Sequence, residues 1–364
     1  MKIYTFLLLI FLFLLVQCTN HEKQELTETN KYFKDFPKDI NLKGSPIEIK
    51  SSSFANFPTS MWKIDSILIL VDSKTENKNL HFLDLNNKKY LFNAISKGNG
   101  PGELTAVSSI VGYALDKPIY AHDLQTQKAY ELSIDSLFLN PNYIPTKYFN
   151  TMGSSNKLKS RLQKLARLND STLIGEMLPA YDGRFMVYDN DFKEKYSFGE
   201  YPPIDWKGRT DSLFFSVMVQ GNIFQGSIIT VPSKGFLIMS HPYLDLIEVF
   251  DVTSGKELVS IIGPEQNYPP EYEGDGIPCK TCKSAYDMVQ YNNGYIFAIY
   301  SGKEHGPNFI GCSYIFQFDI KGNPICKYTL DYEIIDFILD LENNKIYGLA
   351  LDEDKPIIEF EVSI

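Results

Sequence analysis

One short stretch, GNGPGE, looks most like a chemical motif: it places Gly98, Gly100, Pro101, Gly102 and Glu103 within six residues. A glycine-rich loop can bind phosphate through its backbone N–H groups, but such loops carry Lys and then Ser or Thr after the last glycine. Here Glu103 follows, and its carboxylate would repel a phosphate. The stretch therefore predicts a structural turn in which glycines take unusual backbone angles and Glu103 accepts backbone hydrogen bonds. Contact with a ligand is the second interpretation.

The motif CKTC, formed by Cys279 and Cys282, is the other chemical candidate. Two cysteines at this spacing can be redox-active, bind a metal ion or form a disulfide. A zinc site needs four ligands, and the order of His305 and Cys312 after this pair matches no standard zinc module. In an exported protein a disulfide is favoured. A disulfide, free buried thiols and a metal or redox site all remain open.

Other residue types give no catalytic motif. The sequence contains neither H-E-x-x-H nor G-x-S-x-G, so a zinc protease or an ordinary serine hydrolase is not supported. His122 and His241 are expected to be satisfied turn residues rather than ligands. The sequence thus identifies no catalytic residue, and it favours a protein that is not an enzyme without excluding one.

The N-terminus predicts export. Lys2 precedes an uninterrupted apolar run, Thr5 to Val16, which is too short to span a bilayer comfortably and is typical of a secretory signal. LLVQC resembles the lipobox of bacterial lipoproteins, in which the signal, here residues 1–17, is removed and the following cysteine, here Cys18, carries lipid. Gln17 departs from the small residue usual at that position. An uncleaved membrane anchor is the alternative.

The rest of the N-terminal region is polar, and residues 18–43 are expected to form a lipidated tether. It would hold the domain at the cell envelope, on the periplasmic or the surface side of the outer membrane. The chain has 35 basic and 45 acidic residues. Removing residues 1–17 takes away one lysine and leaves 34 and 45, a net charge of −11. With no basic cluster, the sequence argues against nucleic acid as a partner.

From residue 44 the chain consists of short apolar or alternating runs separated by turn residues, which is typical of an all-β fold. An alternating run ends six times in an acidic residue at a spacing of roughly 40 to 70 residues, which predicts six four-stranded repeats and hence a six-bladed β-propeller over residues 44–364. A pair of β-sandwiches is the alternative. The acidic residues are Asp84, Asp135, Asp189, Asp251, Asp319 and Glu361.

Two further elements are expected around these repeats. The chain ends in a strand that needs a partner, and residues 45–52 are expected to supply it and close the ring. Leu158, Leu162 and Leu165 follow a helical spacing, so a helix is expected around residues 155–168.

The residues now support a resemblance. GNGPGEL, CKSAYDMVQYNNGYIFAIYSG and IFQFDIKGNPICKYTLDYEIIDFILDLENNKIYGL together resemble the TolB-like six-bladed β-propeller lipoproteins of Bacteroidetes. The resemblance covers most of residues 45–364. It implies a six-bladed ring, export and lipid anchoring. Within such a ring, the glycine-rich loop is expected to be a joint between the first and second blades. It implies no established activity, because members are mostly uncharacterised.

Two hypotheses on function follow. The first is a binding or scaffold module for a protein or glycan partner, with aromatic and proline-rich loops at 201–206 and 267–278 as contact surfaces. The second is a metal-dependent hydrolase or lyase in the central channel. Calcium is possible there, because propellers can hold it with ligands contributed one per blade, which spacing cannot reveal. Inward carboxylates or histidines converging within metal-ligand reach would favour the second hypothesis.

Overall fold

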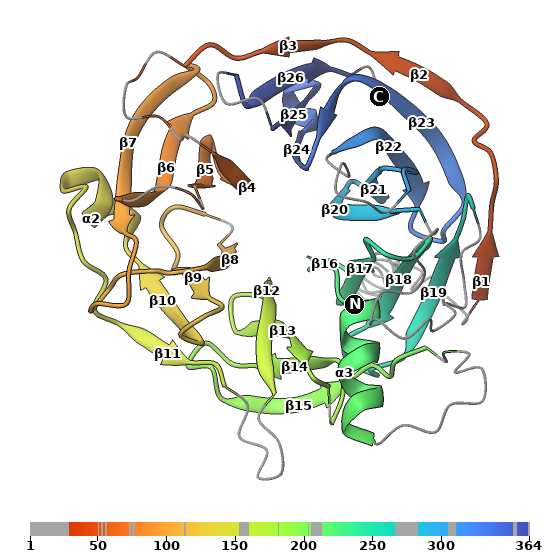
Figure 1. The fold of residues 1–364 in the computed structure, drawn as a ribbon, viewed down its shortest axis with the longest axis horizontal. Coiled ribbons are helices and arrows are strands. Elements are labelled where there is room, and N and C mark those ends of the chain that lie inside the picture. Colours follow the sequence, from red (N-terminus) through yellow and green to blue (C-terminus); the bar gives the residue numbers. More distant parts are fainter. Residues whose placement is uncertain are drawn as a thin grey trace, which may run out of the picture.

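Antiparallel sheets stand around a central axis in the computed structural model (Figure 1). The structure describes residues 29–49, 51, 54, 57–72, 74, 77–112, 114–152, 160–180, 182–202, 204, 213–265, 283–304, 311–351 and 355–362. Over these residues the strands form six sheets of four strands each, five of them built from strands in chain order and the sixth completed by an N-terminal strand, and two sheets carry a fifth strand. The prediction of a six-bladed β-propeller is confirmed.

The six blades use consecutive stretches of the chain, except that an N-terminal strand completes the last one. The strands, blade by blade, are β4 (Pro58–Ile64), β5 (Ile67–Asp72), β6 (Lys78–Asp84) and β7 (Lys89–Ser96); β8 (Val107–Val111), β9 (Ile119–Asp123), β10 (Lys128–Leu132) and β11 (Tyr148–Asn150); β12 (Arg161–Asn169), β13 (Thr172–Leu178), β14 (Phe185–Tyr188) and β15 (Glu194–Phe198); β16 (Ser227–Val231), β17 (Phe236–Ser240), β18 (Leu246–Asp251) and β19 (Glu257–Ile262); β20 (Tyr286–Asn292), β21 (Tyr295–Tyr300), β22 (Cys312–Asp319) and β23 (Pro324–Ile334); β24 (Asp336–Asp340), β25 (Lys345–Leu349), β26 (Ile357–Glu361) and β3 (Gly44–Pro46). The remaining elements are β1 (Thr29–Tyr32), β2 (Asp39–Leu42), α2 (Ile134–Leu139), α3 (Leu213–Phe224) and η1 (Leu341–Asn343).

The acidic residues that marked the repeat have a structural task in four blades. Asp84, Asp189, Asp251 and Asp319 follow or end the third strand, and the side chain of each accepts backbone N–H groups two to four residues further on. Such bonds fix the turn into the fourth strand, because they replace backbone partners that a tight turn lacks. Of the other two, Asp135 lies in the first turn of α2, and Glu361 is the last residue of β26.

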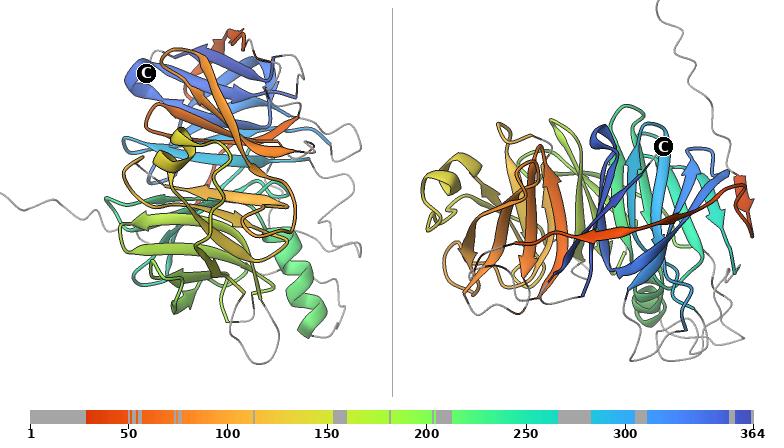
Figure 2. Two further views of the ribbon diagram at one scale, coloured as in Figure 1. Left: turned by 90° about the vertical axis from the view of Figure 1, so that its left-hand side faces the viewer. Right: turned by 90° about the horizontal axis from the view of Figure 1, so that it is seen from above.

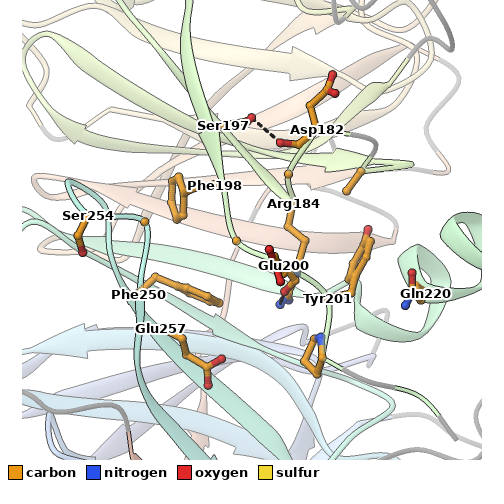
Figure 3. Close-up of a pocket in the computed structure, with 15 residues that line it drawn as sticks. Asp182, Arg184, Ser197, Phe198, Glu200, Tyr201, Gln220, Phe250, Ser254 and Glu257 are labelled. Atoms are coloured by element: carbon orange, nitrogen blue, oxygen red, sulfur yellow. Dashed lines mark hydrogen bonds between the residues drawn. The ribbon is translucent and has the colours of Figure 1, made fainter.

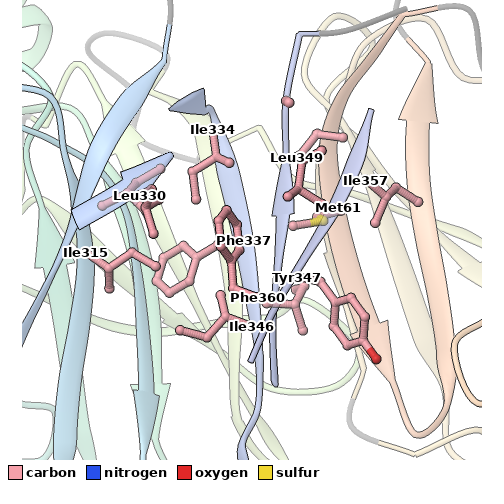
Figure 4. Close-up of a cluster of buried hydrophobic side chains, with 14 of the residues drawn as sticks. Met61, Ile315, Leu330, Ile334, Phe337, Ile346, Tyr347, Leu349, Ile357 and Phe360 are labelled. Atoms are coloured by element: carbon pink, nitrogen blue, oxygen red, sulfur yellow. The ribbon is translucent and has the colours of Figure 1, made fainter. Parts of the chain in front are cut away.

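An N-terminal strand closes the ring. β3 pairs antiparallel with β26, the last strand of the chain, and Ile47 N–H continues the ladder to Ile357 O. This confirms the expected closing strand, although β3 is shorter than the expected 45–52. Apolar side chains of blade 6, among them Phe337 and Phe360, pack between blades 5 and 1 and are fully buried (Figure 4). Strand pairing and apolar burial together hold the two ends of the chain.

Residues 29–42 also belong to the ring, which corrects their assignment to a polar tether. β1 pairs parallel with β19, and β2 pairs parallel with β23. The segment therefore follows the outer edges of blades 4, 5 and 6 in turn, as the red to orange ribbon in Figure 1 shows. Exposed strand edges accept added strands through their unpaired backbone groups, whatever the side chains, and this is why polarity misled the prediction.

The prediction of a helix around residues 155–168 is wrong for the described part of that segment, because Arg161–Asn169 form the strand β12. Two irregularities in the pairing with β13, between Leu162 and Lys164 and between Arg167 and Asn169, interrupt the strand alternation. A β-bulge places an extra residue between two positions on one face of a strand. Leu162 and Leu165 consequently pack in one buried cluster at a spacing that imitates a helix, whereas Leu168 packs in a separate cluster toward blade 4.

The α-helices in the described part of the chain are α2 and α3, neither of which was expected. α2 follows β10, where Ser133 caps it by accepting the Ser136 N–H. α3 lies in the connection from blade 3 to blade 4. Its sequence, LFFSVMVQGNIF, lacks an amphipathic period, and this is why pattern reasoning overlooked it.

The two faces of the ring differ in what they carry. In each blade the first strand lies at the axis and the fourth outside, so all blade-to-blade connections, with α3, lie on one face, here called the connector face (Figure 1). Third strands end on the opposite face, here called the tail face, where α2 follows β10. Because β1 runs parallel to β19, Thr29 also lies at its tail-face end. Figure 2 agrees: α3 lies toward one side of the ring, and α2 and β1 toward the other.

Candidate functional site

A groove of about 830 Å³ lies between the outer parts of blades 3 and 4. The turn between β13 and β14 contributes Asp182 and Arg184, and the chain after β15 contributes Glu200 and Tyr201. Figure 3 shows Tyr201 next to Gln220 of α3, with Arg184 and Glu200 on its other side and Asp182 farther away beside Ser197. Phe198, Phe250, Ser254 and Glu257 complete much of the remaining wall. The groove is assembled from two blades and a helix, so no single segment of the chain encodes it.

The walls of this groove are acidic. Asp182 and Glu200 are exposed, and Glu257 is half-buried. Among the described lining residues the one cationic side chain is Arg184, which is 2% exposed and already ion-paired. Ser197 Oγ donates to Asp182 O at 2.6 Å and holds the turn (Figure 3). The groove therefore presents three carboxylates and no free positive charge from its described residues.

Behind the groove lies a buried ionic cluster. Arg184 donates from Nη1 and Nη2 to the two carboxylate oxygens of Glu248, at 2.9 and 2.7 Å. His241 Nε2 lies 2.7 Å from Glu248 Oε2. The guanidinium group also lies over the rings of Tyr201 and Phe250, at 5.3 and 5.7 Å from their centroids. The two parallel hydrogen bonds fix the orientation of the Arg184 guanidinium, and the Glu248 carboxylate neutralises its charge.

The protonation state of this cluster follows from its surroundings. Burial alone would raise the pKa of Glu248, but the Arg184 charge and the His241 hydrogen bond outweigh burial and lower that pKa to about 2. Burial lowers the pKa of His241, with Arg184 acting in the same direction. A neutral His241 therefore donates its Nε2–H to an ionised Glu248. The cluster carries no net charge and is a structural support for the groove wall.

The central channel is a second cavity, of about 700 Å³, and all six first strands line it. A third cavity, of about 470 Å³, lies where the first strands begin, at the connector face. Its wall includes Ser108, Lys164, Glu176 and Asp287 from four strands. Burial raises the pKa of Glu176 to about 7 and that of Asp287 to about 6. The channel mouth thus holds carboxyl groups that take up protons near neutral pH.

No metal site converges at this mouth in the part of the chain that the structure describes. Within those residues no group of three or more His, Cys, Asp or Glu side chains is placed to hold a metal ion. The calcium prediction for the channel therefore gains no donor set from the described residues. In the same described part, no helix is long and apolar enough to cross a membrane.

Ser108 at the channel mouth contacts a histidine, which raises the question of a nucleophile. Its Oγ lies 2.7 Å from His122 Nδ1, and His122 Nε2 lies 3.0 Å from Thr151 Oγ1. Burial lowers the pKa of His122 to about 3, so at neutral pH the ring is a poor acceptor for a serine proton. His122 instead ties β8, β9 and Thr151 together as a satisfied core residue.

The glycine-rich loop lies between β7 and β8, in the connection from blade 1 to blade 2, and its residues line none of the three cavities. Gly100 N–H donates to Glu103 Oε2 at 2.9 Å. Gly102 has φ +74°, and a Cβ there would contact Ile144 and stand 2.7 Å from Pro145 O. The loop packs against the chain that follows α2, and it has no contact that suggests a phosphate.

The predicted cysteine sites fall elsewhere. Cys18, Cys279 and Cys282 lie outside the described residues, so lipidation at Cys18 and a disulfide or metal at the CKTC motif stay predictions. Cys312 and Cys326 are free and buried. Of the two loops expected to be contact surfaces, 201–206 contributes Tyr201 and Pro202 to the groove, and 267–278 lies outside the described residues. The sequence did not reveal the rest of the groove, because Arg184 and Glu248 behind it are 64 positions apart and neither belongs to a motif.

Fold and cavities define the class: a six-bladed β-propeller with an acidic groove between two blades. The sequence profile described as TolB-like 6-blade propeller-like matches residues 35–342, so the chain belongs to this family. A comparison with curated proteins finds no match.

Two solved structures share the fold at low sequence identity. One is a member of the DUF4221 family from Bacteroides vulgatus ATCC 8482, with a TM-score of 0.61 and 12% identity over 88% of this chain and 95% of that one. The other, from Bacteroides fragilis NCTC 9343, is named as an exported-protein candidate and has a TM-score of 0.55 and 15% identity over 93% of this chain and 99% of that one. At such identities the likeness shows the fold alone.

Proposed function

We propose that the protein is an exported lipoprotein whose propeller binds a partner protein through the acidic groove. The signal-like residues 1–17, the cysteine at position 18 and the description of the Bacteroides fragilis relative as an exported-protein candidate support the anchoring part. Radiolabelled palmitate should enter the wild-type chain in intact cells and should not enter Cys18→Ala. Equal labelling of both chains would contradict the anchor.

The proposal that the groove binds a partner rests on the negative charge of its walls. Three carboxylates, Asp182, Glu200 and Glu257, surround a cavity whose arginine is already neutralised by Glu248. Such a wall attracts a cationic group and repels an anionic one. A partner that presents a basic segment fits this chemistry best. A neutral glycan, which can hydrogen-bond the carboxylates, is the alternative ligand.

A photo-cross-linking amino acid at Gln220 tests this function directly, because Gln220 lines the groove from α3. We expect a cross-linked protein in intact cells whose captured segment is rich in Lys or Arg. Asp182→Asn with Glu200→Gln should weaken capture and its dependence on salt. The matched control is Asp191→Asn with Glu194→Gln, which removes two exposed carboxylates outside the groove.

The two ligand classes give different results. Absence of a cross-linked protein, together with binding to neutral oligosaccharides that Asp182→Asn with Glu200→Gln abolishes, would replace the protein partner with a glycan. Equal capture by the groove variant and the control variant would refute the groove as the binding site.

A further inference from the structure

Exposed apolar side chains gather on the outer part of blade 2. Among the described residues, seven large hydrophobic side chains are exposed, and five of them fall within 138–152. Scattered exposed hydrophobics are normal in folded proteins, but clustering on one element is typical of an interaction surface. The five, here called the rim patch, are Phe138, Leu139, Ile144, Tyr148 and Met152.

The rim patch is held in place by buried neighbours. Ile134 and Leu137 of α2 face the core, which turns Leu139 outward at 88% exposure. Ile144 is 58% exposed, and its other side contacts the loop at Gly102. α2 projects beyond the outline of the ring (Figure 1). The patch is therefore a fixed convex projection and not a groove.

The position of the rim patch relative to Thr29 indicates a membrane as its partner. α2 lies on the tail face, because it follows a third strand, and Thr29 lies at the tail-face end of β1 (Figure 2). From Cys18 to Thr29 the chain can extend at most about 40 Å. A membrane that holds a lipid on Cys18 is thus within reach of the tail face, and the channel mouth on the connector face points away from it.

We propose that the rim patch is a second membrane contact, which inserts Leu139 of α2 into the lipid interface. This rests on the proposed lipid anchor at Cys18. Lipids can rearrange around a convex apolar projection, whereas a rigid protein partner would need a matching cavity, so the shape of the patch favours a bilayer. Tyr148 has Lys128 Nζ 4.4 Å from its ring centroid, and Lys147 pairs with Glu131 at 2.7 Å. Tyrosines and lysines of this kind sit at the level of lipid headgroups.

The test uses the chain from residue 18 with Cys18→Ser, so that no lipid is attached. Co-sedimentation with vesicles of phosphatidylethanolamine and phosphatidylglycerol measures the partition coefficient. We expect binding by the unsubstituted patch and a loss of about tenfold in Leu139→Ser. Leu139 is 88% exposed, so the melting temperature should stay unchanged. Tyr196→Ser, which removes an exposed aromatic on blade 3, is the matched control.

Three outcomes would overturn the proposal. One is no sedimentation of the unlipidated chain at millimolar lipid. Another is equal partitioning of the patch variant and the unsubstituted chain. The third is a self-associated form that only the patch variant loses, which would assign the patch to a second copy. Failure of palmitate labelling would refute the anchor but would leave the vesicle result standing, so the two proposals fail separately.

Discussion

The glycine-rich loop yields the sharpest prediction, since two of the protein's glycines share a backbone conformation but differ in surroundings. Gly102 has φ +74° and Gly235 has φ +70°. A Cβ at Gly102 would stand 2.7 Å from Pro145 O and would also contact Ile144, whereas a Cβ at Gly235 meets nothing within 4 Å. Alanine in the left-handed region costs about 1–2 kcal/mol, and overpacking against backbone adds about 1–3 kcal/mol. We expect Gly235→Ala to lose about 1 kcal/mol and Gly102→Ala about 3 kcal/mol.

Thermal unfolding followed by far-UV circular dichroism measures the difference. For a domain of this size, 1 kcal/mol corresponds to about 1.5 °C in melting temperature, so the two variants should differ by about 3 °C. Adding Ile144→Ala to Gly102→Ala should recover part of the loss, because the contact with the Pro145 carbonyl remains. Equal destabilisation by the two glycine substitutions would refute the idea that the loop is a packed joint between blades.

Three further predictions concern buried charge and the N-terminal strands. Because burial raises the pKa of Glu176 from an unfolded value near 4.5 to about 7, the folded protein should lose stability as pH rises from 5 to 8, by up to about 3 kcal/mol. Glu176→Gln should flatten that part of a urea-denaturation profile, and an unchanged slope would contradict the assignment. Arg184→Met should destabilise the protein by about 3–5 kcal/mol, because it leaves Glu248 buried without its cation. The double variant Arg184→Met/Glu248→Leu should recover most of that loss in the same assay. No recovery would argue against the ion pair. Deleting residues 29–43 should lower the melting temperature and speed hydrogen exchange in β19 and β23, because the edges of these strands become unpaired. Exchange in blade 2 should stay unchanged. Equal protection of β19 and β23 with and without the segment would show that β1 and β2 contribute nothing to the stability of these strands.

Much of the fold could be read from local pattern. Alternating runs that end in Asp predicted blades, because Asp84, Asp189, Asp251 and Asp319 form turns with their immediate neighbours, and such bonds need no distant residue. The closing strand was predictable because a terminal strand without a partner leaves an open edge.

Two wrong predictions, the helix around residues 155–168 and the polar tether over residues 29–42, share one cause. In both, the structure of a segment was decided by pairing with distant parts of the chain. Bulges against β13 made β12 imitate a helix, and the open edges of β19 and β23 took up residues that look like a polar tether. Pairing between strands is a property of two segments, and one segment read alone does not contain it.

The sequence by itself determined the repeat, the turns that separate the strands, the acidic charge and the signal-like start of the chain, since each depends on residues close together. Only the tertiary structure decided where function could lie. It brought Arg184 to Glu248 across 64 positions, gathered Asp182, Glu200 and Glu257 around one groove, and set α2 and Thr29 on the same face. The physical reason is that charge, burial and proximity act between atoms in space, and a ring of blades makes neighbours of residues that the chain keeps far apart.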